Sequence, residues 1–202
     1  MIQNNKENTK GQVGIGTLIV FISLVLVAAI ASSVLLGSAD LLQERGEQTS
    51  EESTDEVSDR VVTQTMFANA TSGQVDSLRV PVRKASGSEA IDLEQATVEY
   101  LNEEDGNQYT LQYDSSIKHD TTGSGFGVVD ATGSVSGAVL DEDGDRADIL
   151  LNLDATSAND IPDQLGEGDE IQLVVVTSSG SETTVRATMP NQMSGDQVYE
   201  VG

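Results

Sequence analysis

The sequence contains no cysteine, so the chain can form neither a disulfide framework nor a thiolate metal site. An exported domain without disulfides must be held together by its core and by its neighbours. The one histidine, His119, precedes Asp120 in a polar stretch, and no Ser-His-Asp arrangement can be argued from it. No glycine-rich phosphate loop follows a predicted strand, and no carboxylate pair lies in an evident apolar cleft. We therefore expect no enzyme and no cofactor.

Positive charge is also scarce. The chain has 10 Lys and Arg residues against 34 Asp and Glu residues, which gives a net charge of −24 at pH 7. A chain this acidic will not bind nucleic acid through phosphate contacts. An excess of carboxylates is typical either of disorder or of a surface suited to high salt, where a Debye length of about 3 Å at 1 M suppresses repulsion. The regular alternation of the later segments argues against disorder, so we expect an extracellular protein of a halophile.

One long apolar run dominates the N-terminal part. No charged residue lies within Gly11–Ala39, and Val13–Ala31 is almost entirely Val, Ile, Leu, Phe and Ala. A helix of about 20 such residues spans the roughly 30 Å hydrocarbon layer of a membrane. A secretory signal peptide has a shorter apolar core, which comes before its small-residue cleavage site. Here the small residue of the candidate cleavage site, Gly11, comes before the apolar core. Lys6 and Lys10 flank the end of the helix expected to stay cytoplasmic.

The order of residues around Gly11 is distinctive. It reads Lys10-Gly11-Gln12-Val13-Gly14-Ile15-Gly16-Thr17-Leu18-Ile19-Val20-Phe21-Ile22, followed by Val25-Leu26-Val27-Ala28-Ala29-Ile30-Ala31. This order resembles the N-terminus of archaeal flagellins (archaellins), closely over residues 1–45 and more loosely afterwards. Bacterial type IV pilins usually carry a Glu early in the mature helix. Its absence here favours an archaellin over a pilin.

The resemblance implies how the N-terminus is processed. Residues 1–11 would be a class III, prepilin-type signal peptide, cut after Gly11 by a membrane-embedded prepilin peptidase. Gln12 would become the new N-terminus, and Gly14 would occupy a position that the peptidase favours. The apolar helix would then remain with the mature protein.

Two fates are open to the apolar surface of this helix. A membrane anchor leaves it in lipid, whereas a filament subunit moves it into a core shared with copies of itself. Burial of a Leu, Ile or Val side chain contributes roughly 1.5–3 kcal/mol relative to water and almost nothing relative to lipid, so packing and assembly machinery must drive the transfer. The resemblance favours the filament. The predicted filament-core residues are Ile15, Leu18, Ile19, Phe21, Ile22, Leu26 and Ile30.

The pattern predicts an α+β chain in two parts. Helical apolar spacing covers residues 12–64, with an acidic stretch at Gln43–Glu56 that is either a helix facing solvent or a soft joint near Gly46. Over residues 65–202 the period changes to two. Short strands at this spacing indicate a β-sandwich or barrel, and the resemblance implies an immunoglobulin-like sandwich. The expected strands are 75–83, 96–102, 109–113, 126–130, 134–140 and 149–153, with a final hairpin of 171–177 and 183–189.

Two short motifs in the second part have alternative explanations. Asp141, Asp143 and Asp145 surround Gly144 and could supply oxygen ligands to calcium, but a hairpin turn predicts the same residues and the spacing is not that of an EF-hand. We therefore expect no metal site there. Asn69 begins an N-glycosylation sequon, which either carries a glycan outside the packed core or occurs by chance.

Three functional hypotheses follow. The first is a structural subunit of an archaeal flagellum (archaellum) filament used for swimming, extracellular after a membrane-bound precursor stage. Its partners would be copies of itself, sister archaellins, the prepilin peptidase and the archaellum assembly machinery. The second is a subunit of an adhesion pilus with a binding surface on its β-domain. The third is a membrane-anchored extracellular binding domain that never polymerises.

Overall fold

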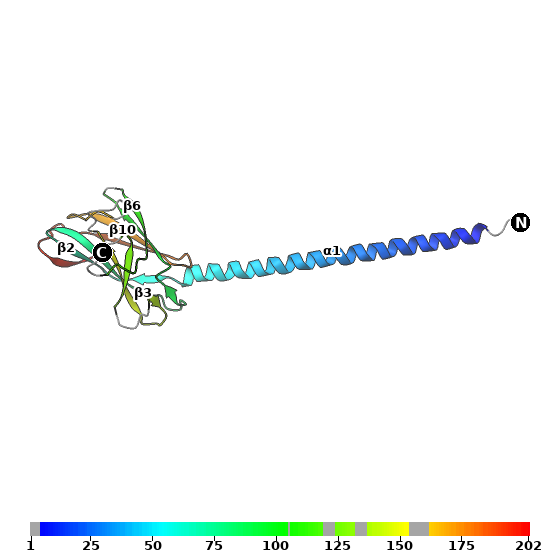
Figure 1. Cartoon of the computed structure of the whole chain (residues 1–202), viewed down its shortest axis with the longest axis horizontal. Helices are drawn as coiled ribbons and strands as arrows, with labels where there is room; N and C mark the ends of the chain where they lie inside the picture. Colours follow the sequence, from blue (N-terminus) through cyan, green and yellow to red (C-terminus); the bar gives the residue numbers. More distant parts are fainter. Residues whose placement is uncertain (1–4, 105, 119–123, 132–136, 154–161) are drawn as a thin grey trace. The chain divides into compact units, whose positions relative to one another are not determined.

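The computed structural model describes residues 5–104, 106–118, 124–131, 137–153 and 162–202. The chain divides into two compact units, Met1–Glu51 and Glu52–Gly202. The long helix α1 (Asn5–Ser58) makes up the first unit and ends in the second, whose other regular elements are β-strands (Figure 1). His119 and residues 134–136 of one expected strand lie outside the described residues.

The helix α1 is continuous through the acidic stretch. Gly46, the site of the alternative soft joint, lies inside the helix, and no atom comes within 4 Å of the place where a Cβ would stand. Of the two alternatives for Gln43–Glu56, the structure contains the solvent-facing helix. A helical glycine costs about 1 kcal/mol relative to alanine, and the surrounding Glu, Gln and Arg are good helix formers.

The helix ends earlier than its apolar spacing predicts. The sequence extends helical spacing to about Gln64, but α1 stops at Ser58 and Val61–Thr63 forms strand β1. Strand β1 pairs antiparallel with Val82–Lys84, and the Val61 side chain is buried in the core of the β-domain. Two β-branched valines in a row favour a strand, and the pairing and burial outweigh the helical spacing.

The second unit contains two larger antiparallel sheets. The first has the order β12 (Gln197–Val201), β2 (Met66–Thr71), β3 (Gln74–Lys84), β9 (Arg146–Asn152) and β7 (Phe126–Asp130), with β1 also paired to β3. The second has the order β11 (Glu182–Thr188), β10 (Glu170–Val176), β5 (Thr97–Asn102) and β6 (Gln108–Gln112). A short ladder joins β4 (Ile91–Asp92) to β8 (Val139–Leu140).

Aliphatic side chains from both sheets form one core. Val80 and Ile149 of the first sheet belong to the same buried cluster as Val98 and Leu173 of the second. Alternate residues of β5 and β10 are buried, as expected for strands with one face on a core. The predicted fold class, a long N-terminal helix followed by an immunoglobulin-like β-sandwich, is confirmed as two packed antiparallel sheets.

The expected strands agree with the structure where alternation was clear. Strands β3, β5, β6, β7, β9 and the β10–β11 hairpin all match, within a few residues at their ends. Within the described residues, the expected strand 134–140 is reduced to Val139–Leu140. The strands that sequence analysis did not list are β1, β2, β4 and β12. In β2 the buried positions include the small residues Ala68 and Ala70, which give a weak hydropathy signal.

We predict that Val175→Ala destabilises the β-domain by about 2 kcal/mol, because it removes two methyl groups from a fully packed position and leaves a cavity. The matched control is Val198→Ala, also in a strand but 60% exposed, which should change the free energy of unfolding by less than about 0.5 kcal/mol. Thermal unfolding of the full chain at high salt measures both. Equal losses would contradict the assignment of a single shared core.

Candidate functional site

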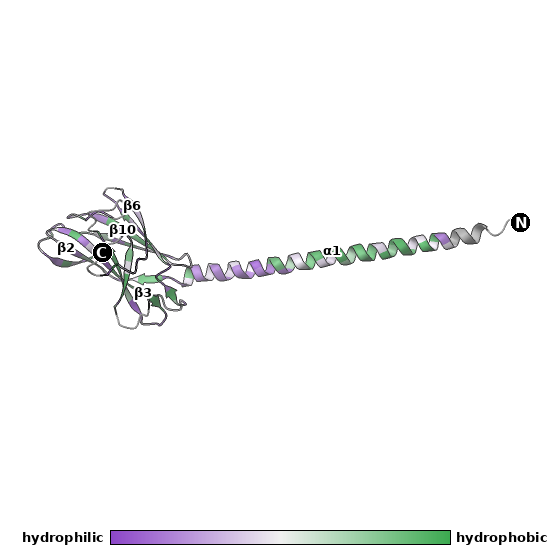
Figure 2. Ribbon diagram, viewed as in Figure 1, coloured by the Kyte–Doolittle hydropathy of each residue, from purple (hydrophilic) through white to green (hydrophobic). Residues whose placement is uncertain are grey.

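The apolar surface of α1 is exposed along most of its length. From Val13 to Leu36 every large apolar side chain is at least 50% exposed. Apolar residues follow one another without a polar stripe, so the apolar band surrounds the helix (Figure 2). A helix that is hydrophobic all round belongs in a protein core or a membrane, and by length and composition α1 is able to cross one. This band is therefore the candidate functional surface.

All seven predicted filament-core residues lie in this band. They are between 56% and 66% exposed, from Ile15 near the start of the band to Ile30. Val20, Leu24 and Val27, which the prediction did not include, are equally exposed. The predicted cleavage bond between Gly11 and Gln12 lies within α1.

Three hydroxyl groups in and next to the band bond to carbonyl groups of the helix itself. Thr17 Oγ1 donates to the Gly14 carbonyl at 2.9 Å, Ser23 Oγ to the Ile19 carbonyl at 2.8 Å, and Ser38 Oγ to the Val34 carbonyl at 2.9 Å. Because each of these three hydroxyls has an acceptor inside the helix, none of the three needs water or a partner chain. The band can therefore be transferred from lipid to a protein core without leaving these groups unpaired.

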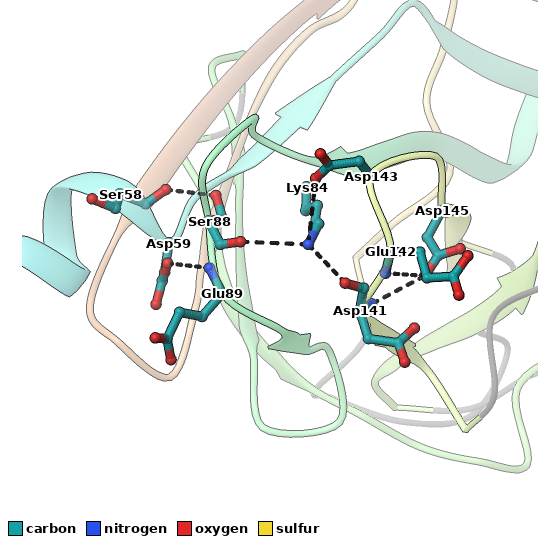
Figure 3. Close-up of polar contacts among 9 residues, drawn as sticks. All are labelled: Ser58, Asp59, Lys84, Ser88, Glu89, Asp141, Glu142, Asp143 and Asp145. Carbon is teal, nitrogen blue, oxygen red and sulfur yellow. Dashed lines mark hydrogen bonds and ion pairs between the residues drawn. The ribbon is translucent and has the colours of Figure 1, made fainter.

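The C-terminal end of α1 is held by the first sheet and the loop after it. Ser88 Oγ donates to the carbonyl of Ser58 at 2.6 Å, and the Glu89 N–H donates to Asp59 Oδ1 at 2.8 Å (Figure 3). Lys84 Nζ donates to the carbonyl of Asp141 at 2.7 Å and holds the Ser88 loop through its carbonyl. These bonds satisfy a helix-end carbonyl that has no partner within the helix.

The second sheet holds the next residues of the chain. Thr177 Oγ1 and Ser179 Oγ both donate to the carbonyl of Asp59, at 3.1 and 3.2 Å. Thr183 Oγ1 donates to the carbonyl of Val61 at 2.7 Å. Residues 58–61 are therefore bonded to the loop after β3, to the β10–β11 turn and to β11. Sequence analysis did not identify this anchor, because single Ser and Thr residues carry no distinguishing signal.

The acidic turn 141–145 uses its carboxylates internally. Asp145 Oδ2 accepts the N–H groups of Asp141 and Glu142 at 3.0 and 2.9 Å, and its residue is buried (Figure 3). Asp143 Oδ1 lies 3.5 Å from Lys84 Nζ. Among the described residues, no group of three or more His, Cys, Asp or Glu side chains is placed to hold a metal ion.

The sequon asparagine lies within strand β2. Asn69 is half-buried, and its Nδ2 donates to Ser77 Oγ of the neighbouring strand at 3.0 Å. Ala68 and Ala70 on either side are buried in the core, so Asn69 belongs to the outer face of the first sheet. A glycan on Nδ2 would replace one of its two hydrogens and leave one N–H able to donate to Ser77.

We predict that Thr183→Val loosens the anchor, because it removes the hydrogen bond to Val61 while nearly conserving shape. A bond of this kind contributes about 0.5–1.5 kcal/mol, so trypsin should cut after exposed Arg60 about 2- to 10-fold faster. Limited digestion of the detergent-solubilised full chain gives the rate. The control is Thr184→Val, an exposed neighbour in the same strand. Identical rates for the two variants would remove the support for the anchor.

Comparison with known proteins places these features in a family. A profile of archaeal-type flagellins matches residues 11–187. The chain is 38% identical to flagellin B1 of Halobacterium salinarum over 187 residues, covering 93% of this chain and 92% of that one. It is 37% identical to flagellin A1 of Haloferax volcanii over 209 residues, covering 96% of each.

A solved structure supports the fold. The subunit in the structure of the archaeal flagellum of Methanospirillum hungatei superposes with a TM-score of 0.65 at 20% identity, covering 91% of this chain and 97% of that one. The family profile matches most of the chain. The sequence around Gly11, the all-apolar helix and the β-sandwich are consistent with that match. The chain belongs to the archaeal-type flagellin family.

Proposed function

We propose that this chain is a structural subunit of the archaellum filament and not an enzyme. The observation that carries the proposal is the apolar band of α1, which has no cover within its own unit and occurs in a member of the flagellin family. The comparisons give no support to the adhesion-pilus or membrane-anchor alternatives. The relatives are named flagellins, and the structure of similar fold is that of an assembled archaeal flagellum.

The band supplies the cohesion of the filament. Around it, copies of α1 would pack side by side, with close approach at the small residues Ala28, Ala29, Ala31 and Ser32. Removal of a Leu, Ile or Val side chain from water contributes roughly 1.5–3 kcal/mol, and the band contains many such residues on each subunit. Contacts between unlike surfaces of neighbouring copies do not close into a ring, so they generate a helical filament.

The membrane is the route by which the band reaches the filament. Before assembly, α1 would lie in lipid, where its internally bonded hydroxyls carry little cost. Cleavage after Gly11 by a prepilin peptidase would remove the charged leader, and assembly machinery would move the helix outward into the filament. Sister archaellins with the same kind of helix would be able to enter the same core. The assembled protein is extracellular.

Glycosylation at Asn69 is a further part of this proposal. The outer face of the first sheet would carry the glycan away from the sandwich core, and away from the apolar band that packs in the filament.

The first test is the processing of the N-terminus. We expect the subunit recovered from sheared extracellular filaments to begin at Gln12, since cleavage must free the apolar helix from its charged leader. Intact-mass analysis reads the N-terminus and any glycan together. Gly11→Val should leave the leader in place and abolish filaments. The control Gly202→Val, also at an open position, should assemble normally. Filaments built from uncut protein would overturn this route.

The second test concerns the band. Ile22→Asn should prevent filament formation, because a buried amide without a partner costs about 1–3 kcal/mol in every subunit. Val57→Asn, at the far end of α1 and 75% exposed, should assemble at the natural level. Sedimentation of sheared filaments measures the yield, and the membrane fraction reports whether precursor was inserted. A normal yield from Ile22→Asn would show that the band does not form the core.

A further inference from the structure

Two arginines of the β-domain lie in an arrangement that has an electrostatic cost. In the pairing of β3 with β9, Arg83 stands directly opposite Arg146, so both side chains leave the same face of the sheet. Like charges placed directly opposite one another destabilise a sheet. A chain with 34 Asp and Glu residues contains ample carboxylate to neutralise them.

Within the described residues, neither guanidinium has a carboxylate partner, although the other two cations of β3 do. Arg79 lies 3.7 Å from Asp148, and Lys84 lies 3.5 Å from Asp143. Arg83 and Arg146 are both exposed, and with Lys84, Ser86 and the turn Asp143–Asp145 they line a depression of about 120 Å³. The nearby carboxylates are already engaged, since Asp145 binds its own turn and Asp143 faces Lys84 (Figure 3).

The chain carries the opposite arrangement on α1. Glu44, Glu47, Glu51 and Asp55 follow one another at spacings of three and four residues, which places them on one side of the helix. All are exposed, and like charges at such spacings destabilise a helix. We call this row the acidic stripe. It lies beyond the apolar band, so packing of the band would leave the stripe outside the apolar core.

We propose that Arg83 and Arg146 bind carboxylates of the acidic stripe on a second copy of this chain. The inference rests on the filament function proposed above, because the filament is what brings a neighbouring helix to the β-domain. One contact would relieve two unfavourable arrangements, the opposed arginines and the row of carboxylates. Two guanidiniums side by side present forked donors that match carboxylate oxygens.

The contact is suited to high salt. At about 1 M salt the Debye length of roughly 3 Å removes long-range repulsion between acidic subunits, whereas a direct guanidinium–carboxylate hydrogen bond acts within that distance. The stripe would therefore set the register between neighbours, with the apolar band supplying most of the cohesion. An arginine pair aimed at a stripe also distinguishes one angular position of the neighbour from another.

Proximity cross-linking tests the proposal directly, because the natural chain has no cysteine. In the variant Arg146→Cys/Glu51→Cys, a short bismaleimide should link neighbouring subunits of sheared filaments into a ladder of dimers and larger species. The control Arg186→Cys/Glu51→Cys uses an arginine of the second sheet, which is bonded to Gln172, and should give no ladder. A product that runs as a monomer, or no product, overturns the proposal.

A charge exchange tests the energetics. Arg83→Glu/Arg146→Glu should shift the dissociation of filaments to higher salt, and the added changes Glu47→Arg/Glu51→Arg should reverse that shift. The control Arg186→Glu should leave the dissociation curve unchanged. Absence of rescue contradicts binding of a second copy. So does a filament in which free phosphate, and not the acidic stripe, binds the two arginines and stabilises the assembly. If the natural chain forms filaments but the variants show neither the cross-links nor the charge-exchange effect, the pairing alone is overturned. If the chain is absent from filaments, the filament function is overturned as well.

Discussion

The apolar band of α1 is the constraint on which the rest of this protein depends. A helix whose large apolar side chains are exposed on every side cannot remain in water, and the unit that contains it has no other element to cover it. The band must lie either in lipid or among other helices. Its freedom from charge and the internally bonded hydroxyls of Thr17 and Ser23 suit both environments. Assembly is therefore the way this chain completes its hydrophobic core.

The β-domain solves a different problem, which is to remain folded and soluble on the outside of an assembly. It has no disulfide, so the shared aliphatic core of its two sheets carries its stability. The carbonyls of Ser58, Asp59 and Val61 at the end of α1 and just after it accept hydroxyl donors from the loop after β3, the β10–β11 turn and β11.

Charge also differs between the apolar part of α1 and the rest of the chain. Carboxylates outnumber Lys and Arg by 34 to 10 in the whole chain, while the segment Gly11–Ala39, which contains the apolar band, has no charge at all. High salt screens repulsion among these carboxylates, which allows acidic subunits to approach one another. Under such conditions the few cations of the β-domain gain importance, because only direct contacts between opposite charges survive screening.

How well the sequence predicted the structure varied with the periodicity of each segment. Strands such as β5 and β10, with clear alternation, were found, and so was the helix, whose apolar run has no soluble alternative. Val61 and Val62 were misassigned to the helix, since their spacing fits both a helix and a strand and only pairing with β3 decides. Strand β12 was missed because Val201 is its one buried residue.

By itself, the sequence determined the apolar helix, the family and the alternating character of the second unit, because each of these is a local property of consecutive residues. Tertiary structure alone decided where the helix ends, how Ser88, Thr177 and Thr183 fasten it, and that Arg83 faces Arg146. These depend on strand register and on residues far apart in the chain. The spacing of residues along the sequence does not show which distant residues come into contact, since the pairing of the strands decides these contacts.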